Sequence, residues 1–167
     1  MRGGGLAYYY KAATNLSLRR AGTGLLALAL SPLVRKYTAT DIAALIPLLR
    51  KNVRSAASAS VTVTALDWTL PALRQVDSDV RGPDHAPDVL LAVDCIYHPA
   101  LVRPLLTTLT ALAMPQRTAA IVVAELRAED VLREFLREWI ALGWRVWSVG
   151  EDLLGARWGM WVAWRET

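Results

Sequence analysis

Cysteine and histidine are scarce in this sequence, which contains Cys95, His85 and His98 and no others of either type. A single cysteine excludes an internal disulfide and fits a reducing compartment, so we expect a cytoplasmic protein, with the nucleus as a second location. Three such side chains are too few soft ligands for a structural zinc site, and we expect no bound metal. Cys95 and His98 could form a nucleophile and its base, but the apolar pattern around Cys95 is typical of a small buried thiol.

Long hydrophobic runs are also absent: none approaches the roughly 20 residues that a membrane helix needs. The first residues, "MRGGGLAYYYKAATN", lack the apolar segment of a secretory signal, and a mitochondrial transit peptide is the less favoured interpretation of their basic, acid-free character. No acidic residue precedes Asp41, yet the cations are spread along the chain and form no clustered stripe. We therefore expect no membrane association and no direct nucleic-acid binding. We also expect a monomer.

What the sequence does contain is an alternation of β-prone and helical segments. With 54% hydrophobic and 20% charged residues in 167, it can form one domain with a substantial core. The strand segments are "RKYTATD", "SVTVTALDW", "DVLLAVDCIY" and "RTAAIVVAELR"; helical segments separate them, except that "TLPALRQVDSDVRGPDHAP" reads as a surface connection. Near-continuous apolar strands are typical of parallel sheets covered on both faces. The pattern predicts an α/β, Rossmann-like, doubly wound sheet.

The end of the chain departs from this alternation. "WRVWSVG" and "RWGMWVAWRE" are two strands without room for a helix between them, so we expect an antiparallel hairpin. Six of the seven tryptophans lie between Trp139 and Trp164. A platform that stacks RNA bases is one interpretation, but the rings are interleaved with Val, Met and Ala, which favours core and helix-covering packing.

A glycine-rich turn precedes the first helical segment, "LLALAL". Gly22 and Gly24 would let the backbone turn tightly and a ligand approach closely, while the helix N-terminus offers unpaired N–H groups. Asp41 then ends the next strand, where a carboxylate can accept both hydroxyls of a ribose. This order predicts a nucleotide-binding site; a flexible entry into an apolar helix is the alternative.

Acidic residues recur at the ends of the predicted strands: Asp41, Asp67, Asp94 and Glu125. In a doubly wound sheet these ends meet on the ligand-binding side. S-adenosylmethionine offers such carboxylates a sulfonium, an ammonium, a ribose diol and an adenine amino group. We expect Asp41 to bind the ribose, Asp67 to accept from the adenine amino group and Trp68 to pack on the purine. A nicotinamide dinucleotide is the competitor, because "GTGLLA" also fits its fingerprint.

Five segments together resemble the family-16, seven-strand protein-lysine methyltransferases, especially fungal members. They are "AGTGLLALAL", "TATD", "LDW", "DVLLAVDCIYHPALVRPLLTTL" and "AELRAEDVLREFLREW", and the most specific piece, Asp94 to Tyr97, is similar to the family's Asp-Val-Val-Tyr signature. The resemblance covers residues 15–167 and leaves 1–14 as an atypical N-terminal extension. It implies transfer of a methyl group from S-adenosylmethionine to a lysine of a protein substrate.

The resemblance also implies which residues act. The cofactor contacts would be Ala21, Gly22, Gly24, Asp41, Asp67, Trp68 and the backbone at Ala92. Asp94 and Tyr97 would face the acceptor as the catalytic pair, with Asp94 orienting the amine and Tyr97 lining its channel. Because the methyl on a sulfonium is already activated, alignment and a neutral amine matter more than covalent catalysis.

Two departures from the family pattern fall in its first motif. Leu18 stands where the family has an acidic residue, and Arg20 stands where it has its first glycine. We therefore expect the first strand to be degraded or incomplete and the chain to be truncated at its N-terminus. A catalytically impaired, methyltransferase-like binding or interaction protein is the second functional hypothesis.

Overall fold

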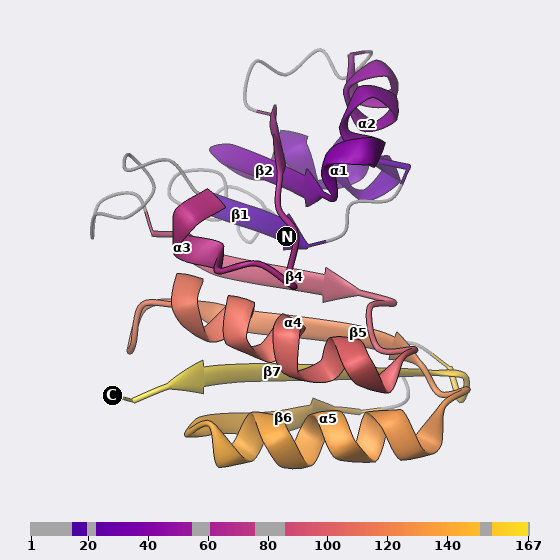
Figure 1. The fold of residues 1–167 in the computed structure, drawn as a ribbon, viewed down its shortest axis with the longest axis vertical. Coiled ribbons are helices and arrows are strands. Elements are labelled where there is room, and N and C mark those ends of the chain that lie inside the picture. The colour runs from indigo at the N-terminus through magenta and orange to yellow at the C-terminus, as the bar shows by residue number, and fades with distance from the viewer. Residues whose placement is uncertain (1–14, 20–22, 55–60, 76–85, 151–154, 167) are drawn as a thin grey trace, which may run out of the picture.

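The structure, a computed structural model, describes residues 15–19, 23–54, 61–75, 86–150 and 155–166. Seven strands form one sheet in the order β3-β2-β1-β4-β5-β7-β6, with helices against it (Figure 1). The strands are β1 Asn15–Arg19, β2 Lys36–Asp41, β3 Val61–Ala65, β4 Val89–Val93, β5 Ala119–Glu125, β6 Trp144–Val149 and β7 Trp158–Arg165. The helices are α1 Leu25–Leu30, α2 Ile46–Val53, α3 Ala72–Gln75, α4 Pro99–Leu112 and α5 Glu129–Ala141, with 3-10 turns at Ser31–Leu33 and Ala43–Leu45.

The expected doubly wound architecture is confirmed. Side chains alternate across β4: Leu90 and Ala92 belong to the core formed with α4 and α5, while Leu91 belongs to the core formed with α1 and α2. Such alternation places the two sets of helices on opposite faces of the sheet. Strands β1 to β5 pair in parallel, because each crossover between neighbours passes over a face of the sheet.

The first strand is not degraded, so that expectation was wrong. β1 runs over five residues in the interior of the sheet and pairs with β2 on one side and β4 on the other. Leu18, at the position of the family's acidic residue, aligns with Ala39 and Leu91. Backbone hydrogen bonds to two neighbours make the ladder independent of the side chain at that position, which explains why the strand persists.

The C-terminal hairpin is confirmed, but its tryptophans are not all packed as expected. β7 pairs antiparallel with both β5 and β6. Trp139, Trp144 and Trp161 lie in the core with α4 and α5. Trp147 and Trp164 are 44% and 38% exposed and stack on each other with ring centroids 4.0 Å apart. These two rings project from the other face of the hairpin, because side chains alternate along each strand.

A short helix was also missed. The segment expected to be only a surface connection contains α3, which comprises Ala72 to Gln75 directly after Pro71. A single turn after a proline has no hydrophobic period long enough to read from sequence. No helix within the described ranges is both long and apolar enough to cross a membrane.

Candidate functional site

A cavity of about 250 Å³ opens at the carboxyl ends of β2 and β3. Its lining residues come from the end of β2 and the residue after it, the chain after β3, and the chain before and within the first turn of α4: Asp41, Ile42, Leu66, Asp67, Trp68, Thr69, Tyr97 and Leu101. Four residues singled out from the sequence, Asp41, Asp67, Trp68 and Tyr97, therefore meet at one place. Parallel strands bring them together, because their carboxyl ends lie on the same edge of the sheet.

Asp41 ends β2 at the base of the cavity. The residue is 3% exposed, and one carboxylate oxygen accepts a hydrogen bond from the backbone N–H of Ile42 at 2.9 Å. Its carbonyl accepts from the N–H of Leu66 at 2.8 Å, which continues the ladder between β2 and β3 past the last residue of β3. The first contact orients the carboxylate, and the second fixes the backbone that carries it.

Asp67 is held in a tight turn after β3. Its Oδ1 accepts from the backbone N–H of Thr69 at 2.8 Å and from the Thr69 hydroxyl at 2.7 Å. The side-chain hydrogen bond and then the backbone one lower the pKa of Asp67, and burial opposes them only slightly. The carboxylate is therefore charged at neutral pH, with Oδ2 on its other side to accept from a ligand.

Gln75 on α3 fastens this turn, and the sequence interpretation missed it. Its Oε1 accepts from the N–H of Asp67 at 2.7 Å, while its Nε2 donates to the carbonyls of Asp67 at 2.7 Å and Leu70 at 3.1 Å. A residue whose partners lie five and eight positions back across a turn gives no local pattern. Gln75 thus ties α3 to the wall of the cavity.

The remaining walls are largely apolar. Leu66 is buried, and Trp68 is half-buried against the core formed with α4 and α5. Tyr97 and Leu101 line the side that faces the first turn of α4. Flat apolar side chains around two carboxylates suit a ligand that combines an aromatic ring with hydrogen-bond donors.

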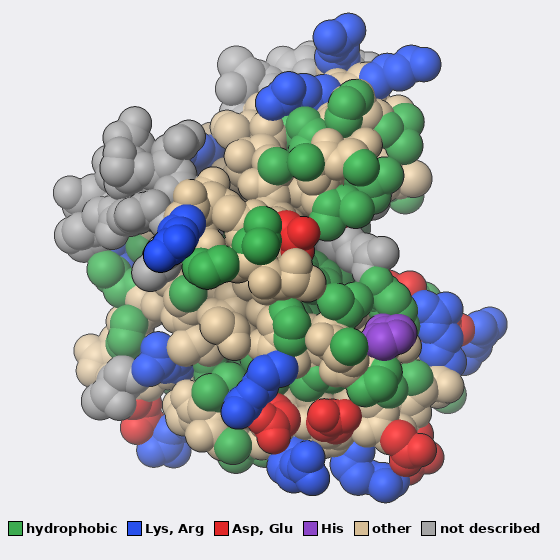
Figure 2. All heavy atoms as spheres, viewed as in Figure 1, with side chains coloured by type: hydrophobic (Ala, Val, Ile, Leu, Met, Phe, Trp, Pro, Cys, Tyr) green, Lys and Arg blue, Asp and Glu red, His purple; other side chains and the backbone are tan. Residues whose placement is uncertain are grey.

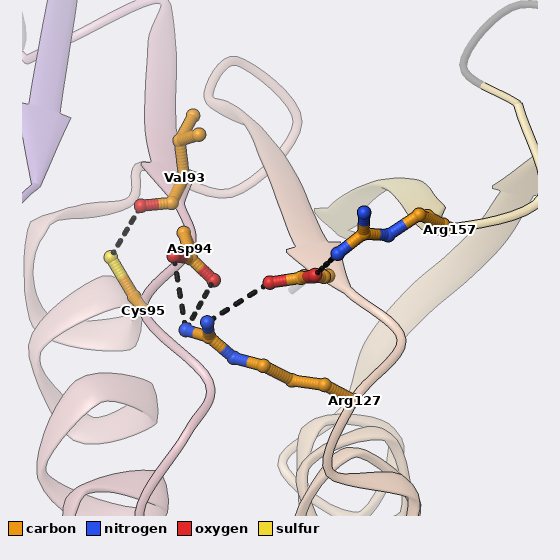
Figure 3. Close-up of polar contacts among 6 residues, drawn as sticks. Val93, Asp94, Cys95, Arg127 and Arg157 are labelled. Atoms are coloured by element: carbon orange, nitrogen blue, oxygen red, sulfur yellow. Dashed lines mark hydrogen bonds and ion pairs between the residues drawn. The ribbon is translucent and has the colours of Figure 1, made fainter.

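Asp94 does not line this cavity. It follows β4 with φ 51, a left-handed conformation that aspartate tolerates better than most residues. Its carboxylate is directed to Arg127, whose Nη2 lies 3.2 Å from both Oδ1 and Oδ2 (Figure 3). Arg127 follows the strand-ending Glu125 by two positions, and its contact with Asp94 joins residues 33 positions apart, so no local sequence pattern indicated it.

Gly24 and Ala92 have structural roles that are visible without any ligand. Gly24 precedes α1 with φ 83, and a Cβ there would lie 2.9 Å from both Leu49 Cδ1 and Val53 Cγ1 of α2. Ala92 is fully buried in β4. Ala21, Gly22 and Arg20 lie outside the described residues.

Cys95 and His98 do not form a nucleophile and base. Cys95 is 2% exposed, and its thiol donates to the carbonyl of Val93 at 3.3 Å. His98 instead precedes α4, where its Nδ1 accepts from the N–H of Ala100 at 3.2 Å. The expectation of a buried structural thiol is confirmed.

Charge is distributed unevenly over the surface. Acidic and basic side chains pair along α5 and between α4 and α5, as Arg133 does with Glu129 and Arg103 of α4 does with Glu138 of α5. Lys and Arg side chains gather over α2 at the top of Figure 2, where the last turn carries Arg50 and Lys51. Those cations lie at a helix C-terminus, where they interact favourably with its dipole.

Comparison with known sequences gives two matches. A family described as lysine methyltransferase matches residues 15–139 of this chain. Ribosomal lysine N-methyltransferase 5 of Eremothecium gossypii is 33% identical over 96 residues, which are 54% of this chain and 30% of that protein. The chain thus spans about a third of the length of that curated relative.

Solved structures resemble the fold at low sequence identity. A methyltransferase from Pyrococcus furiosus has a TM-score of 0.69 at 16% identity, covering 95% of this chain and 77% of its own. Precorrin-6y C5,15-methyltransferase from Geobacter metallireducens has a TM-score of 0.66 at 12% identity, covering 94% and 84%. A Streptococcus mutans protein in complex with SAH has a TM-score of 0.60 at 14% identity, covering 93% and 90%.

Proposed function

Because this chain belongs to the lysine methyltransferase family, we propose that it transfers a methyl group from S-adenosylmethionine to a lysine side chain of a protein. The domain responsible is residues 15–167. The observation that carries the proposal is the cavity at the ends of β2 and β3, where Asp41, Asp67 and Trp68 meet. The alternative is a protein that binds the cofactor but transfers no methyl group, and the experiments below distinguish the two.

The residues around the cavity fit the adenosine half of this cofactor. The buried carboxylate of Asp41 suits a ribose diol, and the charged carboxylate of Asp67 suits an exocyclic amino group. Trp68, Leu66 and Leu101 supply the apolar surface that a purine requires. We also assign Gly24 to this site, because it allows the turn before α1. With them we assign Ala21, Gly22 and the backbone of Ala92.

Bound S-adenosylmethionine supplies a methyl group on a positively charged sulfur, which is already activated for transfer. The protein must then align the acceptor amine and exclude water, and alignment can lower a barrier by about 7 to 11 kcal/mol. We assign Tyr97 to the wall of the acceptor channel and Asp94 to the orientation of the amine. Tyr97 is half-buried and lines the cavity, and it follows Asp94 on the connection between β4 and α4.

The name of the Eremothecium relative makes ribosomal protein the first substrate class to test. The single buried cysteine agrees with a reducing compartment, and we place the protein in the cytoplasm.

Two measurements test the proposal. Calorimetric titration should detect binding of S-adenosylmethionine or its demethylated product, and weaker binding of NAD. Equal or tighter binding of NAD would contradict the cofactor assignment. Incubation with tritiated S-adenosylmethionine and a ribosomal-protein fraction from cells should then label lysine residues, which mass spectrometry locates. Cofactor binding without labelled lysine would favour a binding protein.

Asp41→Asn is the variant that ties binding to this cavity. It retains an oxygen for the Ile42 N–H but loses the charge, so cofactor affinity should fall by roughly 1.5 to 3 kcal/mol. Asp88→Asn is the matched control, because Asp88 precedes β4 at the opposite edge of the sheet and pairs with Arg117. Equal losses in the two variants would remove Asp41 from the site.

A further inference from the structure

Arg127 joins the carboxylates that follow two neighbouring strands. Asp94 comes directly after β4, Glu125 ends β5, and these two strands pair in parallel. The guanidinium places Nη2 3.2 Å from each carboxylate oxygen of Asp94 and Nη1 2.9 Å from Oε2 of Glu125 (Figure 3). One side chain therefore spans the carboxyl edge of the sheet between the strands.

The backbone of Asp94 is fixed independently of this contact. Its N–H donates to the carbonyl of Val123 at 2.8 Å, which extends the ladder between β4 and β5 by one residue. The Cα position is thus set by the sheet, and the direction of the carboxylate is set by Arg127. Removal of the guanidinium would change where the carboxylate points and what charge it presents, without unpairing the strand.

A second arginine, Arg157, also forms an ion pair with Glu125. Arg157, before β7, donates from Nη2 to Oε1 of Glu125, the oxygen that Arg127 does not use. Two guanidiniums and two carboxylates form a chain in which charges cancel. Arg127 is consequently the group that neutralises Asp94, since Glu125 has Arg157 as a second partner.

Resting on the proposed lysine methylation, we propose that Arg127 is a positioning residue that aims Asp94 and cancels its charge, so that the acceptor lysine reacts as a free amine. Free lysine has a pKa of about 10.4 and is almost fully protonated at neutral pH. An uncompensated carboxylate beside it would favour the ammonium further. A carboxylate already paired with a guanidinium accepts a hydrogen bond from the amine without stabilising the extra proton.

Other ionisable groups surround this edge from every neighbouring element. They are Asp41 after β2, Asp67 after β3, Tyr97 and His98 before α4, Glu125 on β5 and Arg157 before β7. Among the described residues, Arg127 is the ion-pair partner of Asp94. Its side chain is 52% exposed, so its replacement leaves the core intact.

The test compares rate against pH for methylation of the ribosomal-protein fraction by the wild type, Arg127→Gln and Arg127→Lys. In Arg127→Gln the rising limb of the kcat profile should shift to higher pH by about one unit. This shift lowers kcat at pH 7 by about tenfold, while KM does not rise. Arg127→Lys retains the charge and should keep the wild-type limb. Arg133→Gln on α5 removes the same charge from a pair with Glu129, outside the network, and should match the wild type.

Asp94→Asn should shift the pH profile in the opposite direction. It also provides a second test of the inference if Arg127→Gln fails to fold. It leaves two guanidiniums against the one carboxylate of Glu125, so the network gains a net positive charge. The rising limb should then move to lower pH, while kcat falls through poorer alignment of the amine. An unmoved limb in a folded Arg127→Gln or Asp94→Asn protein would overturn the inference even though wild-type methylation stands. No methylation by a wild type that binds cofactor would instead overturn the proposed function, and this inference with it.

Discussion

The side chain of Gln75 clasps the backbone of Asp67, accepting from its N–H and donating to its carbonyl, each at 2.7 Å. These two hydrogen bonds connect α3 to the turn that carries Asp67 and Trp68. A glutamine outside the cavity thereby sets the geometry of its wall.

Replacing Gln75 should weaken cofactor binding without removing a contact to the cofactor. Gln75→Ala loses three hydrogen bonds, each contributing on the order of 1 kcal/mol, and we expect cofactor affinity to fall about five- to thirtyfold by calorimetry. Gln116→Ala is the control, because its amide donates to the carbonyl of Glu166 away from the cavity. Similar losses in both variants would show that Gln75 acts only through global stability.

The ionisation of Asp67 should respond to Thr69. The Thr69 hydroxyl and N–H both favour the carboxylate and hold its pKa below the ordinary 3.8. A lowered folded-state pKa stabilises the protein above the unfolded pKa, and this contribution is lost as pH falls through the folded one. Thr69→Val should raise the pKa toward 3.8, whereas Thr69→Ser should retain the shift. Carbon-13 NMR of the carboxyl group measures both; identical titrations in wild type and Thr69→Val would contradict the assigned cause.

Gly24 should be intolerant of any side chain. Gly24→Ala combines a left-handed φ of 83 with a Cβ 2.9 Å from Leu49 and Val53, and we expect a loss of about 2 to 4 kcal/mol in the free energy of unfolding. Gly143→Ala is a matched control, with φ 80 but no atom within 4 Å of the new Cβ. It should lose only about 1 to 2 kcal/mol. Equal losses on urea unfolding would show that contact with α2 contributes nothing.

Cys95 should matter for stability and not for chemistry. Cys95→Ser places a hydroxyl in an apolar core and should cost about 1 to 2 kcal/mol, although the carbonyl of Val93 is within reach of it. Methyl transfer per folded molecule should be unchanged. Loss of activity in a fully folded Cys95→Ser protein, with Cys95→Ala measured beside it, would restore the nucleophile hypothesis.

Much of the architecture could be predicted because it depends on local patterns. The apolar runs of β4 and β5 indicate buried strands, and the apolar residues that recur every four positions in α5 indicate an amphipathic helix. Asp41 and Asp67 could be predicted as neighbours because they end adjacent parallel strands. α3 could not, since a single turn has too few residues to show a period.

The sequence alone determined the doubly wound sheet, the C-terminal hairpin and the acidic strand ends, because strand period and chain order dictate which ends share an edge. Tertiary structure alone decided that Gln75 fastens the turn at Asp67, that Arg127 holds Asp94 and that Trp147 stacks on Trp164. Each of these pairs joins residues separated by a turn, a helix or a strand. Their contacts depend on side-chain direction and distance in the folded chain, which no local pattern specifies.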